Sequence, residues 1–403
     1  MNAAMVLGFM RESGGPVNVG ELMELTGLTR ATVIAICEDL VDRGWVRELE
    51  NGRSTAAYVK GRPARRFAFD AQAAFVLGID IGNRRMTAVL ADMAGTVISR
   101  IAVPFQVLNA PAQERADLLR AITDDALAKA GVAPERILAV SLGVAAPVSR
   151  DGEVLTAQEF WGTFDVRKAL SEWHGWNVLI ENDANLAALA ERWRGTAEGI
   201  DDLVVVLAGD RLGSGVLESG RLLHGNNGAF GELGYLYQLE GVGDPMGMAY
   251  WAHHWGREVL DSGATTRLRE VCNGDPDQLT AEAIFAAAAD NDTAAIEIVN
   301  RLSLRMARVI GSFSTILNPE IVVLAGGVAA PANAVIPIIQ KHLPTFTSTP
   351  PKVKASTLGD SIVSIGAVRH ALNYVEERAL TLRPRSMPDP SEAVVPDDIK
   401  ETA

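Results

Sequence analysis

Hydrophobic and polar positions follow different patterns in different parts of the 403-residue chain. From about residue 75 onward, short runs of Val, Ile and Leu are separated by glycine turns and by alanine-rich stretches with helical spacing. These runs predict six buried strands, Phe75–Ile81, Thr87–Asp92, Ile137–Leu142, Asn177–Ile180, Leu203–Leu207 and Ile321–Leu324. Strands that alternate with helical stretches indicate an α/β architecture with parallel strands.

The first 70 residues show short helical patterns separated by turns. Val19–Thr26 predicts a short helix that ends at Gly27, and Thr29 is a suitable N-cap for a second helix reaching about Arg43. One face of the second helix is apolar and suited to packing, and it consists of Val33, Ile36, Cys37 and Leu40.

Two β-patterns follow these helices. Trp45–Leu49 and Ala56–Val59 predict a pair of wing strands, joined through the turn sequence Asn51-Gly52. The whole segment therefore predicts a winged helix-turn-helix, a DNA-binding unit. The alternative is a small helical packing module that does not contact DNA.

The charge distribution is compatible with DNA binding. The chain has 37 Lys and Arg against 50 Asp and Glu, a formal net charge of −13. The first 70 residues are neutral, with nine of each sign. Within them, a stretch without acidic residues carries five positive charges, Arg53, Lys60, Arg62, Arg65 and Arg66. A local excess of this size suits contact with a phosphate backbone, so the net negative charge of the whole chain does not exclude DNA binding.

Specific positions in this segment are candidates for DNA contacts. In Gly61-Arg62-Pro63 the proline favours an extended backbone at Arg62, and an arginine held in this way can enter a narrow minor groove. The alternative for this tripeptide is a basic linker between domains. We predict phosphate contacts by Arg65 or Arg66. Major-groove contacts are predicted for residues at the start of the second helix, Thr29, Arg30 and Thr32.

Other features restrict the class of protein. Cys37 and Cys272 are the only cysteines, so the chain has no disulfide framework, and we expect a reducing, cytoplasmic location. Cys37 is better explained as a core residue than as a redox sensor. The uncharged stretch Ile321–Gln340 contains glycine and proline, so it predicts a strand, a turn and a helix start and no membrane span. Residues 383–403 are rich in proline and acids and predict a disordered tail.

Four polar or glycine-rich segments of the body resemble one family in order and spacing. They are Gly78-Ile-Asp-Ile-Gly82, Glu181-Asn-Asp-Ala-Asn185, Gly225-Asn-Asn-Gly-Ala-Phe-Gly-Glu-Leu-Gly234 and Leu324-Ala-Gly-Gly-Val328. Together they resemble the ROK family of sugar kinases and sugar-responsive repressors. The N-terminal segment Leu25–Val33 and Gly61-Arg62-Pro63 resemble the family's repressor branch.

The resemblance implies a fold and a division of the chain. The expected fold is α/β, with an N-terminal winged helix-turn-helix followed by a two-lobed, actin-like ATPase (ribonuclease H-like) body of the sugar-kinase type. Residues 1–70 are expected to form the DNA-binding domain with its basic wing and linker. Residues 71–185 are expected to form the first lobe, completed by a helix at about 362–378, and residues 186–361 the larger second lobe.

The resemblance also implies a sugar site between the lobes. In a kinase of this family Asp183 would be the general base, and Asn182 and Glu232 would bind sugar hydroxyls. The alternative for Asn182 and Asp183 is capping of the helix that follows, which explains one of the two. Three further family contact positions carry unusual residues here, Gln158, Tyr235 and Tyr250, and we predict that they also line the ligand site.

Departures from the family pattern affect the expected cofactors. The first two nucleotide loops read Asn83-Arg84-Arg85 and Gly209-Asp210-Arg211, where the family's kinases have small residues that admit phosphates. We therefore expect no ATP cofactor and no kinase activity, with Asp183 as a ligand-binding residue. The family's zinc ligands are also replaced, by Tyr235, Gly241, Gly243 and Met248, so no metal is expected.

The leading hypothesis is a DNA-binding transcriptional regulator, expected to be a repressor of carbohydrate-related genes, controlled by a sugar or polyol bound between the lobes. A homodimer or tetramer on an inverted-repeat operator is expected, without membrane contact. One alternative is an ATP-dependent sugar kinase with an accessory DNA-binding module. Another is a DNA-binding regulator whose signal is a protein partner.

Overall fold

The computed structural model describes residues 2–49, 65–106, 110–155, 165–234, 236–326 and 329–384. The N-terminal domain contains helices α1 (Asn2–Glu12), α2 (Val19–Thr26) and α3 (Arg30–Asp42). The two helices predicted from the sequence, α2 and α3, are confirmed. Asn18 caps α2 with a reciprocal capping box, and Thr29 caps α3 by accepting the N–H of Thr32.

A small antiparallel sheet completes the N-terminal domain. Its strands are β1 (Val17–Asn18), β3 (Arg66–Phe69) and β2 (Val46–Leu49), in that spatial order. The predicted wing strand at 45–49 is confirmed. The second predicted wing strand, at 56–59, lies outside the described residues. The described strand that pairs with β2 is β3, which begins at Arg66, the last of the five positive charges in the stretch without acidic residues.

The body contains two five-stranded sheets with the same layout. The first has the order β6-β5-β4-β7-β8, and its strands are β4 (Phe75–Ile81), β5 (Arg85–Asp92), β6 (Val97–Pro104), β7 (Ile137–Val144) and β8 (Asn177–Asn182). In this sheet β4, β7 and β8 are parallel, while β5 runs antiparallel to both of its neighbours.

The second sheet repeats this arrangement in the order β11-β10-β9-β12-β13. Its strands are β9 (Leu203–Leu207), β10 (Gly213–Glu218), β11 (Arg221–Leu222), β12 (Ile321–Ala325) and β13 (Lys352–Ala355). Here β9, β12 and β13 are parallel, and β10 is antiparallel to its neighbours. The α/β class and all six predicted strands are confirmed, but both sheets are mixed and not purely parallel.

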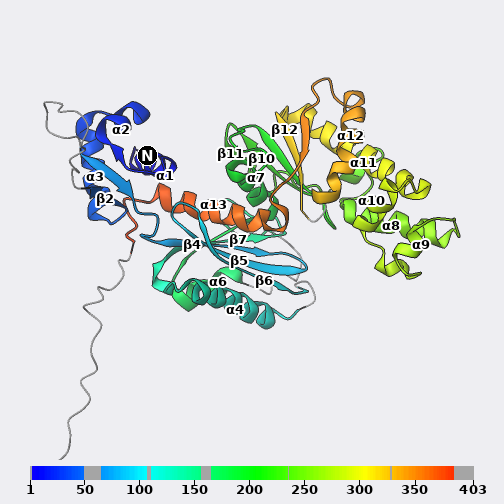
Figure 1. The fold of residues 1–403 in the computed structure, drawn as a ribbon, viewed down its shortest axis with the longest axis horizontal. Coiled ribbons are helices and arrows are strands. Elements are labelled where there is room, and N and C mark those ends of the chain that lie inside the picture. Colours follow the sequence, from blue (N-terminus) through cyan, green and yellow to red (C-terminus); the bar gives the residue numbers. More distant parts are fainter. Residues whose placement is uncertain are drawn as a thin grey trace, which may run out of the picture.

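Helices cover the outer faces of both sheets. In Figure 1, α4 (Ala112–Ala130) and α6 (Val166–His174) lie on the outer face of the first sheet. The second sheet carries a larger helical layer, formed by α8 (Met248–Asp261), α9 (Leu268–Val271), α10 (Ala281–Ala289), α11 (Thr293–Leu317) and α12 (Ala329–His342). Among the described residues, no helix combines the length and the apolar composition that crossing a bilayer requires.

Two helices connect the sheets at the centre of the molecule. Helix α7 (Asp183–Arg194) packs on β9 and β10, and α13 (Ile362–Glu377) packs on β4 and β7. The two helices also pack closely against each other. The predicted lobe boundary at residues 185 and 186 falls inside α7, and the helix expected at about 362–378 is α13.

The N-terminal domain shares a hydrophobic core with the body. Val6, Leu7 and Trp45 belong to the same buried cluster as Val368 and Leu372 of α13. In Figure 1, α13 extends over the first sheet toward α1. Because burial of apolar surface is the main stabilising contribution, this shared core fixes the N-terminal domain on α13.

Candidate functional site: a cleft between the two sheets

A cleft of about 450 Å³ lies between the two halves of the body. Asp80 at the end of β4 and Asn182 at the end of β8 line it from the first sheet, and Gly209 and Asp210 line it from the loop after β9. The first residues of α13, Ile362 and Val363, also line it. Ligands of open α/β sheets bind outside the carboxyl ends of the strands, so this is the expected position for a small-molecule site.

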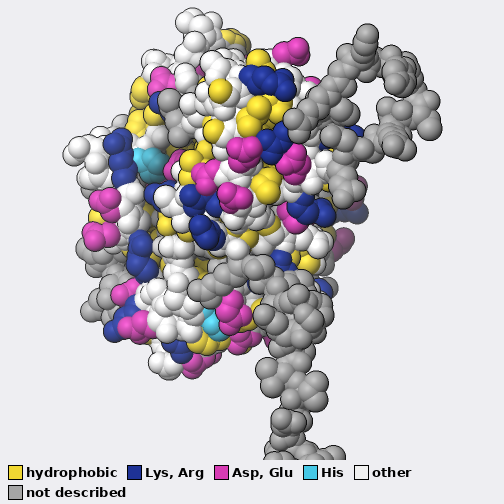
Figure 2. Space-filling model, turned by 90° about the vertical axis from the view of Figure 1, so that its left-hand side faces the viewer, with side chains coloured by type: hydrophobic (Ala, Val, Ile, Leu, Met, Phe, Trp, Pro, Cys, Tyr) yellow, Lys and Arg dark blue, Asp and Glu magenta, His cyan; other side chains and the backbone are white. Residues whose placement is uncertain are grey.

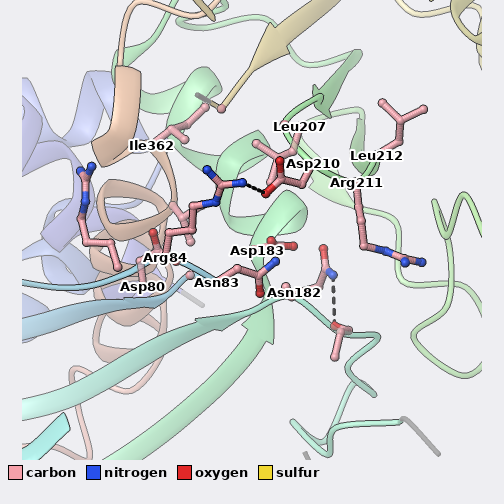
Figure 3. A pocket seen from close by; sticks show the side chains of 18 of the residues that line it. Asp80, Asn83, Arg84, Asn182, Asp183, Leu207, Asp210, Arg211, Leu212 and Ile362 are labelled. Carbon is pink, nitrogen blue, oxygen red and sulfur yellow. Dashed lines mark hydrogen bonds and ion pairs between the residues drawn. The ribbon is translucent and has the colours of Figure 1, made fainter. Parts of the chain in front are cut away.

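Asn182 and Asp183 lie where β8 passes into α7. Asn182 caps α7 by accepting the N–H groups of Ala184 at 2.9 Å and Asn185 at 3.1 Å. Its amide nitrogen donates to the carbonyl of Ala146 at 3.1 Å (Figure 3). One oxygen of Asp183 also accepts the N–H of Ala184, at 2.8 Å. The cap and the hydrogen bond to Ala146 therefore engage both the oxygen and the nitrogen of the Asn182 amide, whereas Asp183 keeps a second oxygen for other contacts.

The carboxyl groups in the cleft have perturbed pKa values. Loss of solvent raises the pKa of Asp183 to about 7, and the charge of Glu232 adds to this shift. Loss of solvent and the charge of Asp183 likewise raise the pKa of Asp80 to about 7. The pKa of Glu232 is raised too, against the opposing charge of Arg211. Carboxyl groups with raised pKa values in a cleft are typical of binding and catalytic sites.

The raised pKa of Asp80 predicts a pH-dependent effect on stability. Between about pH 4, where an unfolded aspartate ionises, and about pH 7, the folded state retains a proton that the unfolded state has lost. Stability should therefore decrease as the pH rises through this window. Asp80→Asn removes this cost and should raise the free energy of unfolding by about 1–3 kcal/mol near pH 8, and by almost nothing near pH 4.

Denaturant titrations at both pH values measure this difference. Asp261→Asn, an exposed substitution at the end of α8, is the matched control and should give no such gain. An Asp80→Asn effect of equal size at both pH values would contradict the desolvation argument.

The two loops at the positions of the expected nucleotide loops contact each other across the cleft. A guanidinium nitrogen of Arg84 lies 2.9 Å from a carboxylate oxygen of Asp210, and Figure 3 shows these side chains pointing toward one another. Arg85 pairs with Asp360 just before α13, at 2.8 Å. Both pairs are exposed, and each joins segments far apart in the sequence. The Arg84–Asp210 pair connects the first half of the body to the second.

The remaining predicted ligand residues are placed as follows. Glu232 lines the cleft, so the structure brings Asn182, Asp183 and Glu232 together. Tyr250 lies in α8, where its ring stacks on His254 and meets Trp251 edge to face, and it does not line the cleft. Gln158 and Tyr235 lie outside the described residues. The roles of these residues as ligand contacts stay predictions.

Two acidic residues of the cleft, Asp80 and Asp360, were not predicted from the sequence. Asp80 could have been found, because it is the polar residue near the end of an apolar strand, within a segment already identified by its glycines. Asp360 could not, because only the packing of α13 against β4 brings it to the cleft.

The predicted DNA contacts lie at the exposed start of α3. Thr29 and Arg30 are exposed and Thr32 is half-buried. The hydroxyl groups of Thr29 and Thr32 lie 2.9 Å apart, and Thr29 also accepts the N–H of Thr32. The two threonines therefore stabilise the helix start, while Arg30 extends from it into solvent.

The predicted phosphate contacts differ in their surroundings. Arg65 pairs with Glu48 of β2 at 2.7 Å and with Glu38 of α3 at 2.6 Å, so two carboxylates already neutralise it. Arg66 is exposed, and Arg62 lies outside the described residues. Figure 2 shows the face that carries the N-terminal domain, with basic and acidic side chains interspersed. For Arg65, a phosphate contact would compete with two existing ion pairs.

Comparison with known proteins identifies the family of this chain. Residues 76–373 match the ROK family, and residues 1–50 match the IclR helix-turn-helix domain. The chain belongs to the ROK family. The resemblance inferred from the sequence, and the expected helix-turn-helix with an actin-like body, are thereby confirmed.

The relatives within the ROK family include kinases and regulators. A glucokinase of Halalkalibacterium halodurans is 25% identical over 308 residues, which is 72% of this chain and 92% of that protein. The DNA-binding transcriptional dual regulator NagC of Escherichia coli is 24% identical over 362 residues, covering 86% of this chain and 85% of the regulator. A crystal structure of a ROK family transcriptional regulator, a homologue of the E. coli MLC protein, matches 94% of this chain and 98% of its own with a TM-score of 0.74 at 20% identity.

The zinc site of the ROK family does not fit this chain. Gly241 and Gly243 have no side chains and adopt left-handed backbone conformations, while Met248 is fully buried in the hydrophobic core. Among the described residues, no three His, Cys, Asp or Glu side chains are close enough to hold a metal ion.

Helix α13 connects the ROK cleft with the N-terminal domain. Its first turn lines the cleft, and its last turns contact α1 and the segment before β2. The indole N–H of Trp45 donates to the carbonyl of Ala379 at 2.7 Å, and Arg11 forms an ion pair with Glu376. Arg369 lies 3.3 Å from the same carboxyl group. The segment from the start of α13 to Ala379 therefore contacts both the cleft and the N-terminal domain.

Proposed function

We propose that this ROK family protein is a cytoplasmic, DNA-binding transcriptional regulator that acts as a repressor of carbohydrate-related genes. A sugar or polyol bound in the cleft controls its affinity for operator DNA. The main support is the single helix α13, which begins at the polar cleft and ends against the helix-turn-helix domain. A ligand that prefers one arrangement of the two halves would shift the DNA-competent population through this helix.

Two features argue that the protein lacks kinase activity. The Arg84–Asp210 ion pair occupies loops where kinases of the family hold nucleotide phosphates, and the carboxylate of Asp210 would repel them. Arg84 would also have to leave this pair before it could serve a nucleotide. The kinase relatives favour the alternative, a sugar kinase with an accessory DNA-binding module. ATP turnover over a panel of sugars, lost in Asp183→Asn, would establish that alternative.

Binding of the effector should depend on Asp183. Thermal-shift screening of monosaccharides and polyols should yield a ligand that raises the melting temperature by mass action. Asp183→Ala should weaken binding of that ligand by roughly tenfold or more, because an acceptor for hydroxyl groups is lost. Isothermal titration calorimetry measures the affinity.

Asp201→Ala, an exposed substitution outside the cleft, is the control and should bind as the unmodified protein does. Absence of any hit from a broad panel would favour the third hypothesis, a regulator that responds to a protein partner. Equal loss of affinity in both variants would contradict the role of Asp183.

Binding to operator DNA should depend on Arg30. Selection from random duplexes should yield a preferred site, expected to be an inverted repeat because a two-fold homodimer, alone or within a tetramer, presents two α3 helices. Arg30→Ala should weaken binding to that site by about 1–3 kcal/mol and relax the sequence preference at one position of each half-site.

Comparison with random-sequence DNA at the same salt concentration tests the base contact. Equal weakening of binding to both DNAs would show that Arg30 contacts phosphate and not a base, and would contradict the recognition-helix assignment. Arg62, which lies outside the described residues, stays a predicted minor-groove contact.

A further inference from the structure

A second cleft, of about 600 Å³, lies farther along α13 than the first. Residues 362 and 363 of α13 line the first cleft, and residues 370–378 line the second, beginning about 10 Å away along the helix. The turn at 149–152 after β7 and strand β11 form the other walls. The second cleft therefore touches the first half of the body, the second half, and the end of α13 that contacts the N-terminal domain.

Basic side chains predominate in the lining of the second cleft. It contains three carboxyl groups, those of Asp151, Glu181 and Glu377. Against them stand four arginines and two histidines, Arg150, Arg167, Arg221, Arg378, His224 and His370. Whether these charges balance depends on which of them already have partners.

Glu181 is fully engaged. One of its oxygens lies 2.8 Å from the imidazole Nε2 of His224, and the other accepts the side-chain amide of Asn185 at 2.9 Å. The second oxygen also accepts the N–H of Asn182 at 2.8 Å. Because Glu181 is buried and held by these contacts, it offers little charge to the rest of the cleft.

The four arginines differ in whether they already have bonding partners. Arg167 donates to the backbone carbonyls of Val178, Asp151 and Gly152, and Arg378 lies 3.4 Å from Glu377. Within the described part of the chain, Arg150 and Arg221 form no ion pair. Arg150 belongs to the first half of the body and Arg221 to β11 of the second.

The cationic groups of the cleft oppose one another. Hydrogen bonding to Glu181 raises the pKa of His224, while the charge of Arg150 works against that shift. Burial and the charge of His224 lower the pKa of His370, so its neutral form is favoured and the cations of the cleft are the arginines and His224. An anion placed among these groups would relieve the repulsion.

We propose that the second cleft binds a small organic phosphate between Arg150 and Arg221. Guanidinium groups bind phosphate through paired, charge-assisted hydrogen bonds. A phosphoryl group presents oxygens in several directions, so it accepts donors that come from the two halves of the body better than a planar carboxylate does. The volume of the cleft accommodates a metabolite of sugar-phosphate size.

Occupation of the second cleft would influence DNA binding. Tyr374 and Arg378, which line it, flank Glu376, the partner of Arg11, and precede Ala379, the partner of Trp45. A phosphate held by both halves of the body would also fix their arrangement near α13. The ligand would therefore act on the same helix as a ligand in the first cleft, from a separate site.

Isothermal titration calorimetry with glycerol 3-phosphate, on the full-length protein, tests the proposal. Glycerol 3-phosphate should bind, and glycerol should not. Arg150→Ala and Arg221→Ala should each weaken binding by roughly tenfold or more, because each removes one charged partner. Arg100→Ala, an exposed arginine on β6 outside both clefts, is the matched control and should leave binding unchanged.

The variant Asp183→Ala tests which of the two clefts binds the phosphate. It should retain glycerol 3-phosphate binding, so a loss in this variant would place the phosphate in the first cleft and overturn the proposal. Equal weakening in Arg100→Ala, or no binding by the unmodified protein, would overturn it as well. Tighter binding of citrate than of glycerol 3-phosphate would refute the phosphate assignment. None of these outcomes depends on whether a sugar binds the first cleft.

Discussion

Replacing Gly366 with alanine should lower the free energy of unfolding by about 3 kcal/mol. Gly366 lies in α13 where this helix crosses α7, and a methyl group there would overlap the backbone carbonyl of Leu186. A backbone atom cannot rotate away as a flexible side chain can, so one of the two helices must shift. Denaturant titration monitored by circular dichroism measures the loss.

Gly8→Ala is the matched control for this substitution. Gly8 also lies inside a helix, α1, but an added methyl group would meet no atom within 4 Å. Alanine has the higher helix propensity, so this variant should be more stable by about 0.5–1 kcal/mol. If both variants gained stability, the close contact between α7 and α13 would not be the reason for the glycine.

The Gly366 substitution also bears on function. Helix α7 begins directly after Asn182, and α13 begins at the cleft, so the crossing at Gly366 sets the distance between the two walls. A shift of either helix would move Asp183 relative to Asp80. We therefore expect Gly366→Ala to bind the effector more weakly, measured at a temperature where the variant is still folded.

Replacing Trp45 with alanine should cost about 3–5 kcal/mol of stability in the N-terminal domain and should abolish operator binding. The Trp45 side chain is fully buried in the core that the N-terminal domain shares with α13. Removing it leaves a large cavity at the junction of the two. Proteolysis and DNA titration together distinguish local unfolding of this domain from unfolding of the whole chain.

The variant Trp45→Phe distinguishes the packing role of the Trp45 ring from its role in coupling the effector to DNA binding. It keeps most of the buried ring but removes the N–H that donates to Ala379. We expect this variant to bind operator DNA, with a smaller change in affinity on adding the effector. Trp173→Phe, on α6 and away from the N-terminal domain, is the control and should respond as the unmodified protein does. An undiminished response in Trp45→Phe would exclude this hydrogen bond from the coupling.

Strongly patterned elements were predictable from the sequence, and weakly patterned ones were not. The apolar runs predicted β4 and β9 with the bounds that the structure has, because strands buried on both faces carry continuous Val, Ile and Leu. Strand β6 lies at a sheet edge with one face exposed, and β10 begins with Gly-Ser-Gly, so neither gives such a run. The strand β3 was not predicted, because it has only four residues and such a short segment gives no clear pattern.

The candidate site was partly predictable for a similar reason. Asn182, Asp183 and Glu232 were identified from their motifs, and the structure brings them to one cleft. The Arg84–Asp210 pair was not predictable. Each residue was recognised as a departure from a phosphate loop, but their mutual contact depends on how the two halves of the body lie.

The sequence by itself determined the α/β class, the helix-turn-helix, the end of α2 at Gly27, the N-cap of α3 at Thr29, and membership of the ROK family. These follow from local patterns, since periodicity, capping and turn chemistry act over a few residues. Only the tertiary structure decided the strand directions in the mixed sheets, the raised pKa values of Asp80 and Asp183, and the route along α13 from the cleft to Trp45. These properties arise from contacts between segments remote in the chain, where burial and neighbouring charges act through space.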